Sequence, residues 1–490
     1  MIIQKLNEVQ NIDISGFTDD QRKAYENIIG FIKSDFNPSK SKIALTGPAG
    51  TGKTFLIRAI IKNCGLPYSQ IGLVAPTHKA TRVAKEAIAI PQIKSNTLQS
   101  DLGLKPNYDI EKFDVNNIKF SLTGRIKIGD YKVYIVDEAS MINRGLAMFL
   151  EKKCLENKCK LIYIGDAFQL PPPGENYSSA FKNIQLCELK QIVRQDASNP
   201  ILPLLNMLRY DIQNNATTFL NYIYTARREN NHIQFDETNA KGFAVCNDDE
   251  FRDAVSMYFT NPILQENVDY VKVVGYTNMC VSSWNKTIRQ SIIKDADKVI
   301  LTQHDLLLSY KTLINAFNES IITNSEDYIV DADGLVNYVH PKYEIKGFLV
   351  KFKAIHGGKV TTPLFVVDHT DMFSVQKYLQ IYNGLIMAAK TAPKQLRAQK
   401  WKEFYAFTEE CLLLTNIVDE NDNPLAFRSI DYGFALTSHK SQGCTFDNVC
   451  VDVRDIVYNK FGQLRDNINI TNRLLYVACS RTKNKLYLKI

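Results

Sequence analysis

A glycine-rich segment near residue 50 has the residue types that hold a phosphate chain. It reads Gly47-Pro-Ala-Gly-Thr-Gly-Lys-Thr54, between an apolar run at residues 42–46 and a helical pattern at residues 55–63. Glycines let backbone N–H groups curl around phosphate, and a helix N-terminus adds partial positive charge. A plain glycine-rich turn is the alternative, which the flanking elements disfavour. The pattern predicts ATP bound by Gly47, Gly50, Thr51, Gly52 and Lys53, with Thr54 ligating Mg²⁺.

Two adjacent carboxylates could complete a site for phosphoryl transfer. Asp137 and Glu138 follow the apolar run Val133-Tyr-Ile-Val136, and open parallel sheets bind ligands at the carboxyl ends of their strands. We expect Asp137 to share the Mg²⁺ with Thr54, and Glu138 to orient and polarise an attacking water. Such a pair alone is more often a solvated turn, so the interpretation depends on the phosphate loop upstream.

A third strand-like run, at residues 161–164, leads into a polar loop that contains Gln169. Its side-chain amide has both a donor and an acceptor, so it could sense the terminal phosphate. A proline-rich stop after a buried strand is the alternative interpretation.

These three segments resemble motifs I, II and III of superfamily 1 helicases, and the resemblance continues along the chain. Residues 17–24 look like the Q motif, 75–81 like motif Ia, 188–195 like the segment that supplies an arginine, 435–443 like motif V and 473–482 like motif VI. The resemblance implies that Gln21 reads adenine, that Gln442 contacts the nucleotide, and that Arg194 and Arg481 reach the γ-phosphate. The motif order and the insertion before motif V most resemble the Dda-like and RecD-like branch, superfamily 1B.

Two arginines from separate segments make physical sense at such a site. A positive charge on the dissociating γ-phosphoryl group is worth about 10³ to 10⁵ in rate. If Arg481 comes from a second sheet, the nucleotide lies between two domains whose closure depends on ATP. A surface salt bridge is the commoner role of each arginine taken alone.

Hydroxyl, imidazole and ammonium groups recur at two analogous strand ends and could grip a nucleic-acid backbone. For each histidine, a local loop hydrogen bond is the alternative. Motif Ib of this branch often carries a histidine, where residues 95–100 have Gln99. The expected contacts are Thr77, His78, Lys79, Thr97, Ser438, His439 and Lys440. We also hypothesise a small pin at residues 107–120, with Phe113 at its tip; a surface loop is the alternative. We expect Trp284 to be packed in a core and not to stack on bases.

The elements that must position these residues indicate an α/β fold. Short β-branched runs alternate with helical patterns in the first half, and a second such set follows residue 270. Residues 306–430 interrupt it, first with an antiparallel β pattern and then with two helices broken near Pro393. With the resemblance, this implies two RecA-like domains (1–95 with 125–199, and 200–305 with 431–490), a pin insertion (96–124) and an SH3-like and helical insertion (306–430).

Composition sets limits on the function. The 490 residues are 45% hydrophobic and 23% charged, with a net charge of +7, which permits a polyanionic partner without demanding one. Ten scattered cysteines without a CxxC pair favour a reduced, cytoplasmic compartment and suggest neither zinc nor an iron–sulfur cluster. No apolar run approaches membrane-spanning length, so we expect neither export nor a membrane partner.

The resemblance to superfamily 1B implies ATP hydrolysis coupled to 5′→3′ movement on single-stranded DNA and to unwinding of forked or tailed duplex. A phage replication or recombination enzyme in the host cytoplasm is expected, monomeric, and working beside single-strand-binding or replication proteins. Two alternatives stay open: an Upf-like RNA helicase, and a nucleotide-gated loading ATPase that does not unwind.

Overall fold

The computed structural model describes residues 12–104, 124–172, 174–191, 199–303, 305–315, 320–421 and 423–490. The chain divides into two compact units. Unit 1 comprises Met1–Ala244, Ser441–Thr445 and Lys460–Lys485, and unit 2 comprises Val245–Lys440, Phe446–Asn459 and Leu486–Ile490. Residues 200–244 thus cluster with unit 1, whereas the four-part scheme proposed from the sequence assigns them to the second motor domain.

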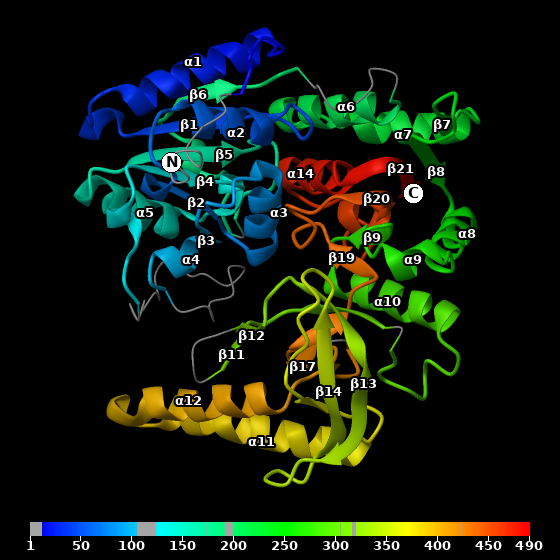
Figure 1. Ribbon diagram of the computed structural model, residues 1–490. Coiled ribbons are helices and arrows are strands. Elements are labelled where there is room, and N and C mark those ends of the chain that lie inside the picture. The colour runs from blue at the N-terminus through cyan, green and yellow to red at the C-terminus, as the bar shows by residue number, and fades with distance from the viewer. Residues whose placement is uncertain are drawn as a thin grey trace, which may run out of the picture. The chain divides into compact units, whose positions relative to one another are not determined.

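Unit 1 contains a six-stranded sheet in the order β3-β2-β4-β5-β1-β6, in which every pairing is parallel (Figure 1). Strands β1, β2, β4 and β5 are short, β-branched runs buried almost throughout, as expected where helices cover both faces of a parallel sheet. The strands are β1 (Lys42–Thr46), β2 (Ile71–Ala75), β3 (Ser95–Thr97), β4 (Val133–Val136), β5 (Lys160–Gly165) and β6 (Gln185–Glu188).

Two apolar layers cover this sheet. Ile28, Ile60 and Ile88 come from helices that pack on one face, whereas Leu98 and Leu150 come from helices on the other. The helices of unit 1 are α1 (Asp19–Lys33), α2 (Lys53–Asn63), α3 (His78–Ile88), α4 (Leu98–Asp101), α5 (Arg144–Glu156), α6 (Ile201–Asn214), α7 (Thr218–Arg228) and α14 (Ile468–Cys479).

A second six-stranded sheet has the order β19-β9-β20-β21-β8-β7, with β9 parallel to both β19 and β20. The predicted α/β class, with two sheets, is therefore confirmed. Its strands are β7 (Ile233–Phe235), β8 (Gly242–Cys246), β9 (Val271–Gly275), β19 (Ala435–Thr437), β20 (Phe446–Asp452) and β21 (Thr482–Lys489). The helices of unit 2 next to this sheet in the chain are α8 (Asp248–Phe259), α9 (Ile263–Glu266), α10 (Asn278–Ile292) and α13 (Val453–Val457).

Trp284 lies in the core of unit 2, as expected. Its side chain is buried, its ring lies 5.2 Å from that of Phe251, and its Nε1 donates a hydrogen bond of 3.1 Å to Asp452. The indole is therefore part of the packing and is not available to stack on a base.

The segment that interrupts the α/β pattern forms an antiparallel sheet and a helix pair. The sheet order is β15-β14-β13-β10-β18. The strands are β10 (Leu306–Ser309), β13 (Asp327–Val339), β14 (Lys346–Ala354), β15 (Leu364–Val367) and β18 (Ile430–Tyr432), with two small pairs, β11 (Leu313–Ile314) with β12 (Ser320–Ile322), and β16 (Ile417–Val418) with β17 (Pro424–Ala426). Helices α11 (Met372–Thr391) and α12 (Lys394–Glu410) meet at Pro393, which confirms the predicted break.

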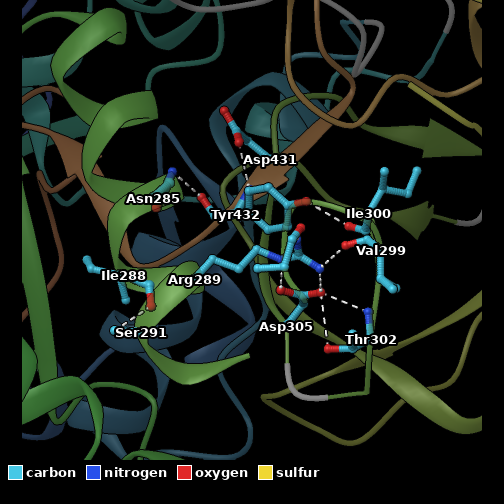
Figure 2. A network of polar contacts seen from close by, with 11 residues as sticks. Asn285, Ile288, Arg289, Ser291, Val299, Ile300, Thr302, Asp305, Asp431 and Tyr432 are labelled. Carbon is cyan, nitrogen blue, oxygen red and sulfur yellow. Dashed lines mark hydrogen bonds and ion pairs between the residues drawn. The ribbon is translucent and has the colours of Figure 1, made fainter. Parts of the chain in front are cut away.

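Arg289 on α10 binds the chain where it leads into the antiparallel sheet (Figure 2). Its Nε and Nη2 donate to the two carboxylate oxygens of Asp305 at 2.7 and 3.0 Å, and further guanidinium bonds reach the carbonyl oxygens of Ala296 and Val299 at 2.6 Å each. The ring of Tyr432, at the end of β18, lies 4.8 Å from the guanidinium carbon. One buried cation on α10 thus contacts the chain both where it enters the inserted sheet and where it leaves that sheet.

Among the helices that the structure describes, none is long and apolar enough to cross a membrane. All ten cysteines lie in the described part of the chain, and none of them forms a disulfide there.

We predict that Arg289→Met lowers the free energy of unfolding by about 3 kcal/mol or more, because the mutation leaves the Asp305 carboxylate buried without its cation. Urea unfolding of the full chain, followed by circular dichroism, measures the change. Lys298→Gln is the matched control, since it breaks the exposed ion pair with Asp295 and should cost about 1 kcal/mol at most. Equal losses in the two variants would contradict the anchoring role of Arg289.

Candidate nucleotide site

The phosphate loop connects β1 to α2 in the conformation that its glycines permit. Gly50 and Gly52 have φ angles of 85° and 79°, in the left-handed region. The Lys53 ammonium donates to the carbonyl oxygens of Gly47 and Pro48 at 2.6 and 2.9 Å. The loop therefore curls around the position of the Lys53 amine, at the N-terminus of α2.

Two glycines of the loop are also required by contacts within the protein. A Cβ on Gly47 would lie 2.7 Å from the carbonyl oxygen of Leu189, and a Cβ on Gly52 would lie 2.7 Å from Nε2 of Gln21. Gln21 is buried at the start of α1, and its Nε2 donates to the carbonyl oxygen of Thr51 at 2.9 Å. Gln21 therefore braces the loop, a role that the sequence did not indicate; its adenine contact stays a prediction.

The two carboxylates stand at the end of β4, and their backbone is unusual. Asp137 N donates to the Val74 carbonyl oxygen at 2.8 Å, while Glu138 has a φ of 50° and donates its N–H to Asp137 Oδ1 at 2.9 Å. For a non-glycine residue the left-handed conformation is uncommon and costs free energy. Here the left-handed residue ends the extended chain of β4 and begins the helical turn at Ala139–Met141.

Charge interactions around Glu138 tune its ionisation. Burial, and then the negative charge of Asp137, raise the pKa of Glu138 to about 7, while the nearby cations Arg481 and Lys53 oppose that rise. Burial also raises the pKa of Asp137. Glu138 can therefore exchange a proton near neutral pH, as a general base requires.

Segments from motifs V and VI lie beside the carboxylates within unit 1. Arg481, only 5% exposed, lies between α14 and β21 and donates to the carbonyl oxygens of Cys444 and Val477 at 3.2 and 3.1 Å. A Cβ on Gly443 would lie 3.9 Å from Cγ of Glu138. The structure thus brings together Lys53, Glu138 and Arg481, three residues far apart in the chain.

The loop after β5, which carries Gln169, is bound to α14. Arg473 Nη1 donates to the carbonyl oxygens of Ala167 and Gln169 at 2.7 and 2.8 Å, and Tyr476 donates its hydroxyl to Asp166 at 2.8 Å. Gln442 Nε2 reaches the Leu170 carbonyl oxygen at 3.3 Å. The side-chain oxygen of Gln169 is buried and has no hydrogen-bond partner among the described residues, which leaves it available to a ligand.

Three residues of this region were missed at the sequence level: Asp166, Tyr476 and Arg209. The Arg209 guanidinium, on α6, lies 5.9 Å from the Tyr476 ring, and its Nε and Nη2 are buried without a partner in the described part of the chain. Asp166 follows a strand just as Asp137 does, so its position was a usable signal. Arg209 belongs to no recognisable motif, and only the fold reveals it.

The residues expected to hold DNA in unit 1 have local structural roles as well. Thr77 Oγ1 accepts the N–H of Ala80 and caps α3, and Thr97 caps α4 in the same way through Ser100. Burial lowers the pKa of His78, and Lys79 is only 8% exposed. The hydroxyl oxygens of Thr77 and Thr97 already accept these capping hydrogen bonds. Each hydroxyl group would therefore bind a phosphate by donating its hydrogen.

In unit 2, the corresponding residues follow β19. Ser438 is buried and its Oγ donates to the Gly275 carbonyl oxygen at 3.1 Å, while the His439 ring lies 6.2 Å from that of Tyr276. The Lys440 ammonium donates to Asn324 Oδ1 at 3.1 Å and lies 4.8 Å from the ring of Tyr310. Three other predictions, Arg194, Phe113 and the pin at residues 107–120, lie outside the described residues.

The donors for a metal ion are few. In the part of the chain that the structure describes, no cluster of three or more His, Cys, Asp or Glu side chains could form a protein cage. The Thr54 hydroxyl and the Asp137 carboxylate fit Mg²⁺ nonetheless, because this ion takes oxygen ligands and is usually shared between one or two carboxylates and substrate phosphates.

Comparison with known proteins gives consistent matches. Residues 17–222 match the model of an AAA domain. The ATP-dependent DNA helicase Dda of Enterobacteria phage T4 is 24% identical over 492 residues, which cover 96% of this chain and 99% of that protein. The RecD2 DNA helicase of Deinococcus radiodurans is 29% identical over 162 residues, 33% of this chain and 20% of its own. The crystal structure of Candida albicans Pif1 helicase is 20% identical, covers 96% of this chain and 94% of that one, and has a TM-score of 0.48.

The full-length match to Dda agrees with the order of the motifs quoted above, from the phosphate loop to Arg481. Over nearly its whole length the chain is similar to an ATP-dependent DNA helicase.

Proposed function

We propose that the protein is an ATP-dependent DNA helicase that moves 5′→3′ on single-stranded DNA and unwinds forked or tailed duplex, in phage replication or recombination. One observation carries the proposal: Glu138, with a pKa near neutral, lies within the electrostatic reach of both Lys53 and Arg481 beside a phosphate loop. The DNA substrate and the phage setting are supported by the relative in phage T4, which is an ATP-dependent DNA helicase.

In this proposal the phosphate loop binds the β- and γ-phosphates of ATP. The Lys53 ammonium exchanges its bonds to the Gly47 and Pro48 carbonyls for phosphate oxygens. Thr54 and Asp137 would hold Mg²⁺, which would supply positive charge to the phosphates. Glu138 accepts the proton of the attacking water, which its pKa of about 7 permits at physiological pH.

Arginines stabilise the charge that develops on the γ-phosphoryl group. Arg481 is the first, because its charge already acts on Glu138. Arg209 is the second, because two of its guanidinium nitrogens are buried without a hydrogen-bond partner among the described residues, which is costly unless an anion meets them. Arg194 is the third, by resemblance. Such charges act in the transition state, so they raise the rate more than they raise nucleotide affinity.

Gln169 links the nucleotide to the rest of the motor. Its side-chain oxygen has no hydrogen-bond partner among the described residues, and its backbone carbonyl accepts a hydrogen bond from Arg473 on α14. A change at the γ-phosphate therefore reaches α14 through one residue.

The DNA backbone is held in unit 1 by Thr77, His78 and Lys79, and in unit 2 by Ser438, His439 and Lys440. Phe113 splits the duplex. The protein acts as a monomer in the host cytoplasm, beside single-strand-binding or replication proteins.

Strand displacement tests the proposal. We expect displacement from 5′-tailed DNA, and its complete loss in Lys53→Ala, because the ammonium that holds the phosphates is gone. Lys62→Ala, at the other end of α2, is the matched control and should keep activity.

Each other outcome of this assay has a definite meaning. A preference for a 3′ tail contradicts the direction, and a preference for 5′-tailed RNA favours an Upf-like enzyme. DNA-stimulated ATP hydrolysis without displacement favours a loading ATPase.

The pH dependence of kcat/KM for ATP tests Glu138. A base must be ionised, so the rate should rise with pH, pass its midpoint near the pKa of about 7, and level off above it. The Asp166 carboxylate raises that pKa, so Asp166→Asn should move the midpoint to lower pH. A flat profile, or a midpoint that does not respond to Asp166→Asn, would argue against Glu138 as the base.

Arginine variants test the two buried guanidinium groups. Arg481→Ala and Arg209→Ala should each lower kcat by about 10³-fold with little change in KM, and Arg209→Lys should recover part of the loss. Steady-state ATP hydrolysis measures both constants. Arg228→Ala, on the exposed surface of α7, is the control. A purely structural role for Arg209 would instead lower the unfolding midpoint while leaving kcat of the folded fraction intact.

A further inference from the structure

The first half of α12 carries charges that oppose the helix dipole. Lys394, Arg397, Lys400 and Lys402 lie in its first nine residues, before any acidic side chain. Cations near a helix N-terminus are unfavourable, because the dipole there is positive. By contrast, α8 has three acidic residues in its first turn. Pro393, the N-cap of α12, provides no side-chain hydrogen bond. The cations in the first turns of α12 therefore reduce the stability of the helix, and their presence requires an explanation other than helix stability.

Three of these cations lack an anionic partner. Lys400 pairs with Glu403 at 2.9 Å. Lys394, Arg397 and Lys402 are exposed, and they form no ion pair with any residue that the structure describes. The exposed charge is therefore available to an external anion.

Two aromatic rings lie among these cations. Tyr405 is 56% exposed, and its ring lies 6.2 Å from that of the partly exposed Trp401, with an angle of 34° between the ring planes. Phe404 supports them from beneath: its ring contacts Trp401 edge-on at 5.5 Å and Tyr382 of α11 at 5.1 Å. Packing against α11, the neighbouring helix in Figure 1, thus holds the rings in place.

These side chains share one face of the helix. Lys394, Trp401 and Tyr405 are spaced by seven and four residues, which places them in one row, with Arg397 and Lys402 on either side. We call these five residues the basic–aromatic face. It extends for about 16 Å along the helix.

We propose that the basic–aromatic face of α12 is a binding site for single-stranded DNA, separate from the strand-end residues described above. Bases stack on Trp401 and Tyr405, and phosphates meet Lys394, Arg397 and Lys402. Cations beside sequence-tolerant stacking surfaces are what binding of single strands requires. A second copy of this chain is disfavoured as the partner, because the face and the whole chain, at +7, are both positive. The choice of DNA rests on the proposed helicase function.

Intrinsic fluorescence tests the stacking. The chain has two tryptophans, and Trp284 is buried in the core, so quenching of the emission by oligothymidine reports on Trp401. We expect saturable quenching that disappears in Trp401→Phe. Trp401→Ala and Tyr405→Ala should each weaken binding of a labelled oligothymidine, measured by anisotropy, by about tenfold.

Salt dependence tests the charges. In Lys394→Gln/Arg397→Gln, the slope of log affinity against log salt should fall by about 1.4, because two phosphate contacts to a single strand are lost. Lys286→Gln/Lys294→Gln is the matched control. It removes one exposed cation within α10 and one just after its end, and it should leave the slope of log affinity against log salt unchanged.

The outcomes separate this inference from the proposed function. Binding of oligothymidine without Trp401 quenching overturns the inference and leaves the helicase proposal standing. No binding at all overturns both. Quenching by an acidic peptide such as polyglutamate, but not by oligothymidine, overturns the inference in favour of a protein partner.

Discussion

Two neighbouring carboxylates at the end of one strand are the constraint on which the nucleotide site depends. Asp137 and Glu138 are partly buried side by side, and each raises the free-energy cost of ionising the other. Only nearby cations make the arrangement tolerable, and Lys53 and Arg481 provide them from segments before and after it in the chain. The short strands, the left-handed turn at Glu138 and the attachment of α14 all serve to keep these four charges together.

The features that are local in sequence were predictable, and those that depend on distant partners were not. The phosphate loop, the strand ends and the break at Pro393 are each encoded within a few residues, so pattern and spacing sufficed. Gln21 illustrates the limit: its place in a motif suggested a nucleotide contact, but its hydrogen bond to Thr51 depends on how α1 packs. Arg209 illustrates it further, since nothing within its own helix distinguishes it from a surface arginine.

Thr77 and Thr97 show how one residue type can satisfy two demands. Serine and threonine are preferred both at helix N-caps and in contacts with phosphate, so the sequence alone could not separate these roles. In the structure both threonines cap helices. A substitution at either position would therefore change local stability together with any contact to DNA.

The inserted sheet in unit 2 is attached by buried charges. Besides Arg289 with Asp305, the fully buried Lys272 of β9 donates to the Gly433 carbonyl oxygen at 2.6 Å and lies 3.8 Å from Asp327 of β13. Buried pairs of this kind specify geometry more than they add stability. A rigid attachment would make α12 move together with β9, the strand of unit 2 that bears Lys272.

The close protein neighbours of Gly47 and Gly52 have a consequence for how the phosphate-loop sequence diverges among related proteins. A Cβ on Gly47 or Gly52 would clash with Leu189 or Gln21 of the protein itself, whereas the hydrogen bonds of the Lys53 amine among the described residues go to the carbonyls of its own loop. In a lineage that abandons catalysis, selection on folding would preserve both glycines while the lysine drifts. The identity of the residue at position 53, and not the glycine pattern around it, therefore distinguishes a working descendant from an inert one.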